Sequence, residues 1–324
     1  MIQIAHRIVL TEKCNLSCPH CFNANVREDR VMDVDLFIRF MEENSSSLND
    51  ALLKIMGGEP TVHPRILEVM KESVKHYGNV SLFTNGTTMA EVAKDPIIIK
   101  NHFQGRIGYV INGFTFNIKD FTTYRDYIHS ATLHFVIPLK NHEAVIEKIE
   151  KCMELYPQVW FVLSPDTQLD LIDGEDLEPY RKVWTHAITT IVSKLRSINS
   201  PFNFDHRLPM CFYTQEMIDE FHSVGLDKLH QETTTCCGDQ QIGLIGYNFD
   251  IYYCNQTRIK LGSLLDTNGN PRSVEEINEM IQSASKIKVE QIKNISDKCH
   301  DCNVLATCKV GCYYNNLLER NENE

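Results

Sequence analysis

Three cysteines near the start of the chain have the residue type and spacing that iron–sulfur chemistry needs. Cys14, Cys18 and Cys21 form a C-x₃-C-x₂-C run. Three thiolates can hold three irons of a cubane [4Fe–4S] cluster, and the fourth iron is then left without a protein ligand. A cluster that only transfers electrons normally has a protein ligand on every iron. The spacing therefore indicates that another molecule binds the cluster and that chemistry takes place there.

Zinc is the alternative metal for this run, because closely spaced cysteines also bind zinc or serve as redox thiols. The chain contains 12 cysteines, and its first residues show no secretory signal pattern. Both observations predict a reducing, cytoplasmic environment in which thiolates bind metals instead of forming disulfides. Taken alone, the run does not choose between zinc and an iron–sulfur cluster.

The composition is that of an ordinary globular protein with enough residues for a large core. Of the 324 residues, 43% are hydrophobic and 23% are charged, which is typical of this class. No apolar run reaches the length of a membrane span, so no membrane partner is expected. The formal net charge of −11 disfavours nonspecific binding to nucleic acid.

A glycine pair and a carboxylate follow one of the apolar runs. Gly57-Gly58-Glu59-Pro60 comes directly after Leu52–Met56. Glycines let the backbone approach a ligand closely and adopt positive φ, and Glu59 adds a carboxylate. An isolated glycine pair is more often a plain β-turn. Its place on the second strand, after the cysteine run, favours a ligand-binding turn.

Short apolar runs alternate with segments of helical spacing. Strands are predicted at Arg7–Leu10, Leu52–Met56, Val80–Phe83, Ile107–Ile111, Leu133–Ile137 and Val159–Leu163. Helices are predicted at Asp35–Glu43, Arg65–His76, Met89–Ile99, Phe121–Ser130 and His142–Tyr156. This alternation predicts an α/β fold with parallel strands and right-handed crossovers. Parallel β/α barrels place their active sites at the C-terminal ends of strands, where Cys14, Gly57 and Asn85 all fall.

The cysteine run after a first strand, followed by the GGEP stretch, resembles the radical S-adenosylmethionine (radical SAM) superfamily. The resemblance implies a partial (β/α)₆ TIM-like barrel and a [4Fe–4S] cluster whose open iron binds the amino and carboxylate groups of SAM. One electron from the cluster would cleave SAM to a 5′-deoxyadenosyl radical, which abstracts hydrogen from a substrate. Gly57, Gly58 and Glu59 would bind the SAM ammonium group through backbone carbonyls and the carboxylate.

The same resemblance assigns further contacts with SAM. Phe22, next to the third cysteine, would lie against the adenine, and Asn85 would line the pocket. In the family the fourth strand usually ends in a serine that reaches the ribose, whereas this chain has Asn112. Ser164, at the end of the sixth strand, is a second ribose candidate. Ordinary loop polarity is the alternative role for Asn112 and Ser164. His20 replaces the aromatic residue that the family usually has before the third cysteine.

A second group of cysteines lies in the C-terminal third of the chain and resembles the SPASM domain, an extension that holds auxiliary [4Fe–4S] clusters in radical SAM enzymes. The resemblance assigns Cys237, Cys254 and Cys312 to a first auxiliary cluster and Cys299, Cys302 and Cys308 to a second. Zinc is again the alternative, since two such cysteine pairs can form a zinc ribbon.

The tail departs from the family pattern in two places. Phe249 stands where the family has a glycine, five residues before Cys254, and no cysteine follows Cys312. The second auxiliary cluster therefore lacks its usual fourth ligand. Another group could substitute, the iron could stay open to substrate, or only one auxiliary cluster could form. The candidate groups are Asp297, His300, Asp301, Cys211 and Cys236.

These features predict a barrel domain over residues 1–205 and a SPASM-like domain over residues 206–324. Because the first strand begins near Met1, no leader-binding domain is expected before it. Enzymes resembling this arrangement mostly modify peptides, so the expected substrate is a ribosomally made peptide that is crosslinked, epimerised or oxidised. No residue is singled out as a catalytic acid or base.

Two other functions stay open. One is a radical SAM dehydrogenase or mutase that acts on a small metabolite such as an aminosugar. The more remote one is a non-catalytic iron–sulfur or zinc-binding protein. For an enzyme, the resemblance also implies a reductase such as flavodoxin or ferredoxin as the electron donor.

Overall fold

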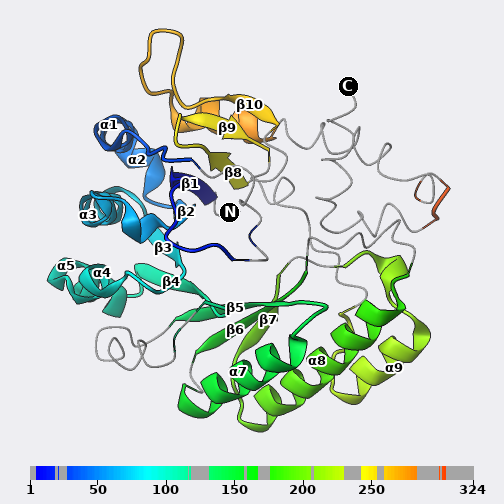
Figure 1. Cartoon of the computed structure of the whole chain (residues 1–324). Helices are drawn as coiled ribbons and strands as arrows, with labels where there is room; N and C mark the ends of the chain where they lie inside the picture. Colours follow the sequence, from blue (N-terminus) through cyan, green and yellow to red (C-terminus); the bar gives the residue numbers. More distant parts are fainter. Residues whose placement is uncertain are drawn as a thin grey trace. The chain divides into compact units, whose positions relative to one another are not determined.

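The computed structural model describes residues 5–18, 21, 28–115, 117, 131–156, 159–166, 176–205, 208–229, 242–253, 259–282, 299 and 301–303. The chain forms two compact units (Figure 1). Unit 1 comprises Met1–Thr132 and Cys237–Ser285, and unit 2 comprises Leu133–Cys236 and Lys286–Glu324. The boundary predicted between residues 205 and 206 stays a prediction. The predicted residues outside the described ranges are His20, Phe22, Cys236, Cys237, Cys254, Asp297, His300, Cys308 and Cys312, with the helix Phe121–Ser130.

The sheet of unit 1 has the strand order β10-β9-β8-β1-β2-β3-β4. Four of the six predicted strands belong to it and run parallel: β1 (Ala5–Thr11), β2 (Leu52–Gly57), β3 (Asn79–Thr84) and β4 (Ile107–Asn112). In β2, Leu53 and Ile55 are fully buried, whereas their neighbours are half-buried. This alternation arises because successive side chains point to opposite faces of a sheet.

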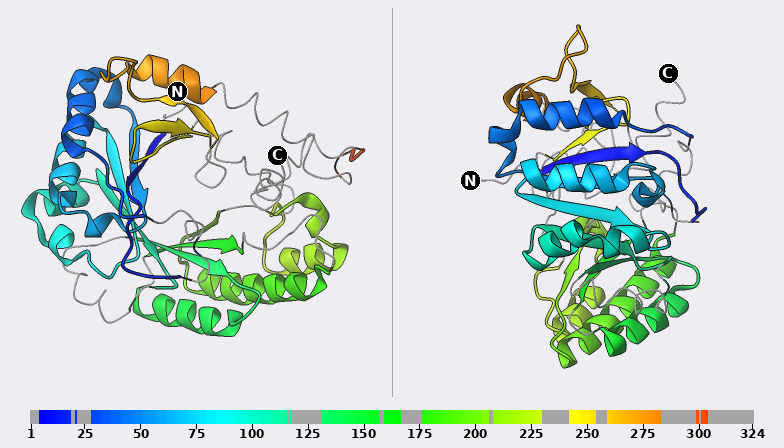
Figure 2. Two further views of the ribbon diagram at one scale, coloured as in Figure 1. Left: turned by 45° about the horizontal axis from the view of Figure 1, so that its top comes forward. Right: turned by 90° about the vertical axis from the view of Figure 1, so that its left-hand side faces the viewer.

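Helices cover one face of these strands (Figures 1 and 2). They are α1 (Val34–Glu43), α2 (Ser45–Leu48), α3 (Ile66–His76), α4 (Ala90–Lys94) and α5 (Pro96–Phe103). The carboxylate of Asp33 caps α1 by accepting the N–H of Leu36 at 3.1 Å. Phe37, Phe40 and Met41 then fall on one side of α1 and are fully buried, as their spacing of three and four residues requires.

The prediction of one continuous helix over Met89–Ile99 is wrong. The segment contains α4, which ends at Lys94, and α5, which begins at Pro96. Proline has no N–H for a helical hydrogen bond and disfavours helical backbone at the preceding residue, so the chain leaves the helix at Asp95. The carboxylate of Asp95 then caps α5 by accepting the N–H groups of Ile97 (3.0 Å) and Ile98 (3.3 Å).

A segment from far along the chain extends the unit 1 sheet. It consists of β8 (Ile242–Ile245), β9 (Asp250–Tyr252) and β10 (Lys260–Ser263). β8 pairs in parallel with β1, with Ile8 opposite Ile245, whereas β9 is antiparallel to both β8 and β10. The sequence-based prediction did not include this pairing.

The sheet of unit 2 has the order β5-β6-β7. Its strands are β5 (Thr132–Ile137), β6 (Trp160–Pro165) and β7 (Phe202–Phe204), and the first two match predicted strands. The helices are α7 (His142–Leu155), α8 (Glu178–Ser197) and α9 (Gln215–Ser223), with the short helix η3 (Met210–Phe212). Cys152 lies on the buried side of α7 and is fully buried, and burial raises the pKa of its thiol to about 11. Among the described helices, none is long and apolar enough to cross a membrane.

Candidate functional site

The loop that carries the first three cysteines is closed at its base by a short antiparallel stem. We call residues 14–18, 21 and 28 the cysteine loop, and residues 11–13 and 29–31 the stem. Glu12 donates its backbone N–H to the carbonyl of Arg30 (2.9 Å), which also accepts the hydroxyl of Thr11 (2.9 Å). Thr11 and Val31 form an antiparallel bridge. The stem continues β1 directly, so the loop begins where the first strand ends.

The three thiols match an iron–sulfur cluster by donor type. Cys14, Cys18 and Cys21 are all half-buried, and none is in a disulfide. The N–H of Cys21 donates to the carbonyl of Cys18 at 3.2 Å, which turns the chain between the second and third thiols. Within the described residues, no three His, Cys, Asp or Glu side chains are gathered closely enough to hold a metal ion. The donor set fits a cluster by its soft sulfur ligands, and cluster binding has to draw the thiols together.

The glycine pair of the GGEP turn lies against the stem. Gly58 donates its N–H to the carbonyl of Thr11 (2.7 Å), and Glu59 donates to the carbonyl of Lys13 (2.8 Å). A Cβ atom on Gly57 would lie 2.2 Å from the oxygen of Thr11, and one on Gly58 would lie 2.2 Å from the oxygen of Lys13. Gly57 also has a φ of 149°. The close approach that requires these glycines is therefore made by the protein's own backbone, directly before Cys14.

Glu59 is fully buried, and its carboxylate joins the ends of two strands. One oxygen accepts the N–H and the hydroxyl of Thr61 (3.0 and 2.5 Å) and the hydroxyl of Thr84 (2.7 Å). The other accepts the N–H of Asn85 at 2.6 Å. Thr61 belongs to η2 (Pro60–Val62) after β2, and Thr84 ends β3. The role of Glu59 toward SAM stays a prediction, whereas its role in fixing the two turns is visible in these contacts.

Asn85 connects the turn after β3 to the cysteine loop. Its side-chain N–H group donates to Asn15 Oδ1 (2.8 Å), and Asn15 donates to the hydroxyl of Thr87 (2.8 Å). Thr87 completes a ring by donating its hydroxyl to Asn85 Oδ1 (2.7 Å). Asn15 directly follows Cys14, so this ring fixes the start of the cysteine loop. Sequence reasoning missed Asn15 and Thr87, and only their positions beside Cys14 and Asn85 hinted at a role.

Asn112 lies at the exposed end of β4, and its side chain accepts the N–H of Phe114 at 3.0 Å. The hydroxyl of Thr115, three residues further on, donates to the carbonyls of Asn85 (3.1 Å) and Asn112 (3.3 Å). The segment after β4 therefore contacts the same turn as the cysteine loop. A contact of Asn112 with ribose stays a prediction.

Ser164 belongs to unit 2, where it is almost fully buried near the end of β6. Its hydroxyl lies 2.5 Å from Nε2 of His134, which is on the neighbouring strand β5. In β5 the fully buried residues are Leu133, Phe135 and Ile137, so His134 points to the other face. That alternation is the sequence signal that could have found His134. The ribose contact of Ser164 stays a prediction.

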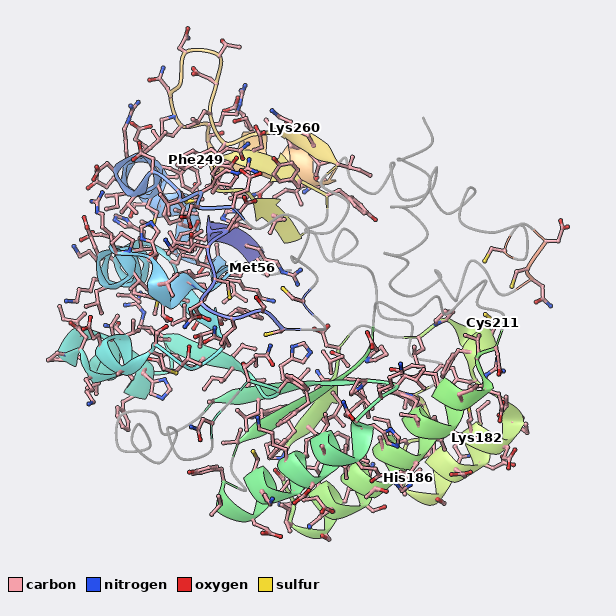
Figure 3. The ribbon with its side chains drawn as sticks, in the orientation of Figure 1. Met56, Lys182, His186, Cys211, Phe249 and Lys260 are labelled. Carbon is pink, nitrogen blue, oxygen red and sulfur yellow. The ribbon has the colours of Figure 1, made fainter. Side chains whose placement is uncertain are left out.

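Three of the C-terminal cysteine candidates fall within the described residues. Cys299 and Cys302 are half-buried and not in disulfides, and Cys302 donates its N–H to the carbonyl of Cys299 at 3.3 Å. Cys211 is exposed on η3 (Figure 3), and its carbonyl accepts a hydrogen bond from Arg181 at 3.4 Å. The ligand sets of the auxiliary clusters stay predictions, because their other cysteines lie outside the described residues.

Phe249, which replaces the glycine of the family pattern, adopts the backbone conformation that favours glycine. Its φ is 65°, and its ring is buried in the turn between β8 and β9 (Figure 3). Its N–H donates to the carbonyl of Gly246 (2.9 Å), and its carbonyl accepts the N–H of Leu264 (2.7 Å). The turn therefore keeps the left-handed residue that the family pattern implies, and burial of an aromatic ring offsets its strain.

The fold and the site place the protein among α/β proteins whose parallel strands carry a cysteine loop and a glycine-rich turn at their C-terminal ends. Residues 8–164 match the family model described as the radical SAM superfamily. This part of the chain is a radical SAM domain, and it contains every residue predicted to bind the first cluster or SAM. For residues 8–164 the match supports an activity of the radical SAM type, with a [4Fe–4S] cluster and SAM as cofactors.

Two curated relatives are similar to part of the chain. A "Tungsten-containing aldehyde ferredoxin oxidoreductase cofactor-modifying protein" of Pyrococcus furiosus is 33% identical over 84 residues, which cover 25% of this chain and 24% of the relative. A "Probable GTP 3′,8-cyclase" of Pyrococcus horikoshii is 37% identical over 89 residues, which cover 27% of this chain and 28% of the relative. The chain thus matches only about a quarter of the length of these relatives.

Solved structures resemble the chain over nearly its whole length. Streptococcus suis SuiB bound to S-adenosylmethionine matches with a TM-score of 0.60 and 18% identity, covering 97% of this chain and 74% of SuiB. The structure of anSMEcpe with bound AdoMet matches with a TM-score of 0.62 and 15% identity, covering 99% of this chain and 95% of anSMEcpe. At these identities the likeness shows the fold alone, which is the predicted α/β class with a TIM-like partial barrel.

Proposed function

We propose that the protein reductively cleaves SAM and uses the resulting radical to modify a ribosomally made peptide. When bound, the cluster and SAM supply the electron and the 5′-deoxyadenosyl radical that abstracts hydrogen from the substrate. The protein holds the cluster with Cys14, Cys18 and Cys21 and positions SAM with the GGEP turn and the turn after β3.

One observation carries this proposal: three segments distant in sequence are joined by direct hydrogen bonds at the ends of neighbouring strands. The stem contacts the GGEP turn through Lys13 and Glu59 (2.8 Å), and the cysteine loop contacts the turn after β3 through Asn15 and Asn85 (2.8 Å). A site that must hold a metal cluster and a nucleotide side by side needs such a fixed arrangement.

Several observations support a peptide as the substrate class. The fold is similar to that of Streptococcus suis SuiB, which has also been solved bound to its precursor peptide SuiA. The C-terminal cysteines resemble a SPASM domain, so one or two auxiliary clusters are proposed near the substrate. Phe22, Asn112 and Ser164 are proposed as SAM contacts, and a flavodoxin or ferredoxin is proposed as the reductase.

A small-molecule substrate is the second candidate. The observation that favours it is the set of relatives named GTP 3′,8-cyclase, whose name gives a nucleotide as substrate. The predicted alternative of a dehydrogenase or mutase for a small metabolite such as an aminosugar belongs to this class.

The reaction is tested by anaerobic reconstitution with iron, sulfide and dithionite, followed by chromatography for 5′-deoxyadenosine. We expect the wild type to release 5′-deoxyadenosine from SAM. The triple variant with Cys14, Cys18 and Cys21 changed to Ala should lose this product and about four irons per chain. The matched control is Cys152→Ala, which removes a thiol from the core of α7. Release of 5′-deoxyadenosine by the triple variant would overturn the assignment of the cluster.

The substrate class is tested with the same reconstituted protein by mass spectrometry. Short peptides encoded beside the gene and a set of nucleotides and aminosugars are each incubated with SAM. A peptide product with an altered mass supports the first candidate, and an altered nucleotide or sugar supports the second. If neither the peptides nor the nucleotides and aminosugars change in mass while 5′-deoxyadenosine is still formed, both substrate assignments are overturned. The proposal that the protein cleaves SAM would then still stand.

A further inference from the structure

The stem of the cysteine loop carries a second set of contacts, made by charged side chains. Glu12 and Arg30 face each other across the stem, with Glu12 Oε2 3.2 Å from Arg30 Nε. One residue further along, Lys13 and Asp29 form an ion pair of the same length, 3.2 Å. Each side of the stem thus carries one acidic and one basic residue, and each of them pairs with the residue of opposite charge on the other side.

The two ion pairs differ in burial. The side chain of Glu12 is 5% exposed and that of Arg30 is 40% exposed, whereas Lys13 and Asp29 are 55% and 81% exposed. Exposed ion pairs contribute little, because water screens them and ordering two long side chains costs entropy. A carboxylate as buried as that of Glu12 needs a partner much more. The energetically important pair is therefore Glu12 with Arg30.

Arg30 also contacts the C-terminal segment of unit 1. Its guanidinium donates to the hydroxyl of Tyr247 at 2.5 Å and lies 5.0 Å from the centre of the Tyr247 ring. Tyr247 lies in the turn between β8 and β9, and β8 pairs with β1 next to the stem. The hydrogen bond with Tyr247, together with Glu12 and Glu28, raises the pKa of Arg30 above its usual value.

We propose that Arg30 is a positioning residue for the [4Fe–4S] cluster: it closes the cysteine loop through Glu12 and anchors it to the β8–β9 turn through Tyr247. The proposal rests on the proposed function, because it takes the three cysteines of the loop as cluster ligands. A loop whose ends are held together has fewer conformations to lose when its thiols converge on iron. Opening the stem therefore weakens cluster retention without removing any ligand.

The test measures iron release from the reconstituted protein to a chelator, for single and double variants. Arg30→Met should release iron about tenfold faster than the wild type, because it removes both the ion pair with the buried Glu12 and the hydrogen bond with Tyr247. Tyr247→Phe, which removes one hydroxyl, should release it about threefold faster. The matched control Asp29→Asn, which breaks the exposed pair in the same stem, should stay within about twofold.

A double-mutant cycle shows whether Arg30 acts through Glu12. The double variant Glu12→Gln/Arg30→Met should release iron no faster than Arg30→Met alone, because residues that act through one another are not additive. Rates that multiply in the double variant would overturn the proposal. So would an Arg30→Met rate within twofold of wild type, or an equal effect of Asp29→Asn. If Arg30→Met does not fold, Tyr247→Phe decides, and a rate of iron release equal to that of wild type would overturn the anchoring of the loop through Tyr247.

A measurement on the apoprotein separates this proposal from the proposed function. Hydrogen–deuterium exchange of peptides spanning 8–16 should be faster in Arg30→Met than in wild type, because the N–H of Glu12 bonds across the stem. Unchanged exchange would overturn the stem role. Failure of the wild type to bind iron or cleave SAM would instead overturn the proposed function and leave the exchange result intact.

Discussion

The backbone N–H of Asn85 donates to the carboxylate of Glu59 at 2.6 Å, so the turns after β2 and β3 share one buried charge. The other carboxylate oxygen accepts hydrogen bonds from Thr61 and Thr84. A buried carboxylate is stable only when donors surround it in this way. Glu59 therefore fixes the two turns to each other by contacts within the protein itself.

Glu59→Gln should destabilise the apoprotein even though it keeps the shape of the side chain. Both carboxylate oxygens of Glu59 accept hydrogen bonds. In glutamine an NH₂ group, which only donates, replaces one of these two oxygens. A donor then faces a donor in a buried position, which costs about 1–3 kcal/mol. Urea unfolding of the apoprotein measures this loss. The control Glu42→Gln changes an exposed carboxyl of α1 and should leave the midpoint unchanged. Equal midpoints for both variants would contradict the structural role of Glu59.

Gly58→Ala should displace the cysteine loop, because the added Cβ atom would lie 2.2 Å from the carbonyl oxygen of Lys13. The three nearest atoms are all backbone atoms of Glu12 and Lys13, so the stem has to move away from the GGEP turn. We expect iron content after reconstitution to fall by more than half. The control is Gly108→Ala on β4, where the nearest atom is the hydroxyl of Ser81 at 3.5 Å. Full iron content in Gly58→Ala would show that the loop does not depend on this contact.

The six predicted strands are all present. Burial alternates along β3, β4 and β5, whereas β1 is buried along almost its whole length, and both patterns are visible as short apolar runs in the sequence. The first cluster and the GGEP turn were also predictable, since their residue types and spacing are local. Helix α8 was not predicted, although the buried residues Tyr180, Trp184, Ala187 and Ile191 recur at three and four residues. That helix could have been found from its spacing alone.

Other features could not be predicted, because they depend on pairing between distant segments. β8 is only four residues long, and nothing in it indicates β1 as its partner. The donors around Glu59 come from two turns, and Tyr247 reaches Arg30 across 217 residues of sequence. The sequence correctly predicted that another group approaches the backbone of the GGEP glycines closely. The sequence could not reveal that the approaching group is the stem.

Phe249 offers a paired test of backbone strain against burial. Phe249→Ala and Phe249→Gly both remove the buried ring, which costs about 3–5 kcal/mol. Glycine also removes the strain of a positive φ, which costs other residues about 1–2 kcal/mol. We therefore expect both variants to be less stable than wild type in urea unfolding, and Gly to be more stable than Ala. Equal stability of the two variants would show that a φ of 65° costs Phe249 nothing.

His6 should make the stability of the protein depend on pH below neutrality. It is fully buried beside Tyr77, with Nδ1 3.0 Å from the tyrosine hydroxyl. Burial lowers its pKa from 6.5 to about 4, and Asn278 partly opposes this shift. Between these values the unfolded chain binds a proton that the folded protein does not, so stability rises with pH. As pH falls from 6.5 to 4, His6 should remove about 3 kcal/mol of unfolding free energy.

Urea unfolding at several pH values between 4 and 6.5 measures this contribution. His6→Gln cannot take up a proton, so its unfolding free energy should fall less steeply with decreasing pH than that of wild type. The control His186→Gln changes a histidine whose side chain is 55% exposed, and its profile should keep the wild-type slope. If His6→Gln kept that slope as well, the acid sensitivity would come from other groups, and the buried His6–Tyr77 pair would be indifferent to protonation.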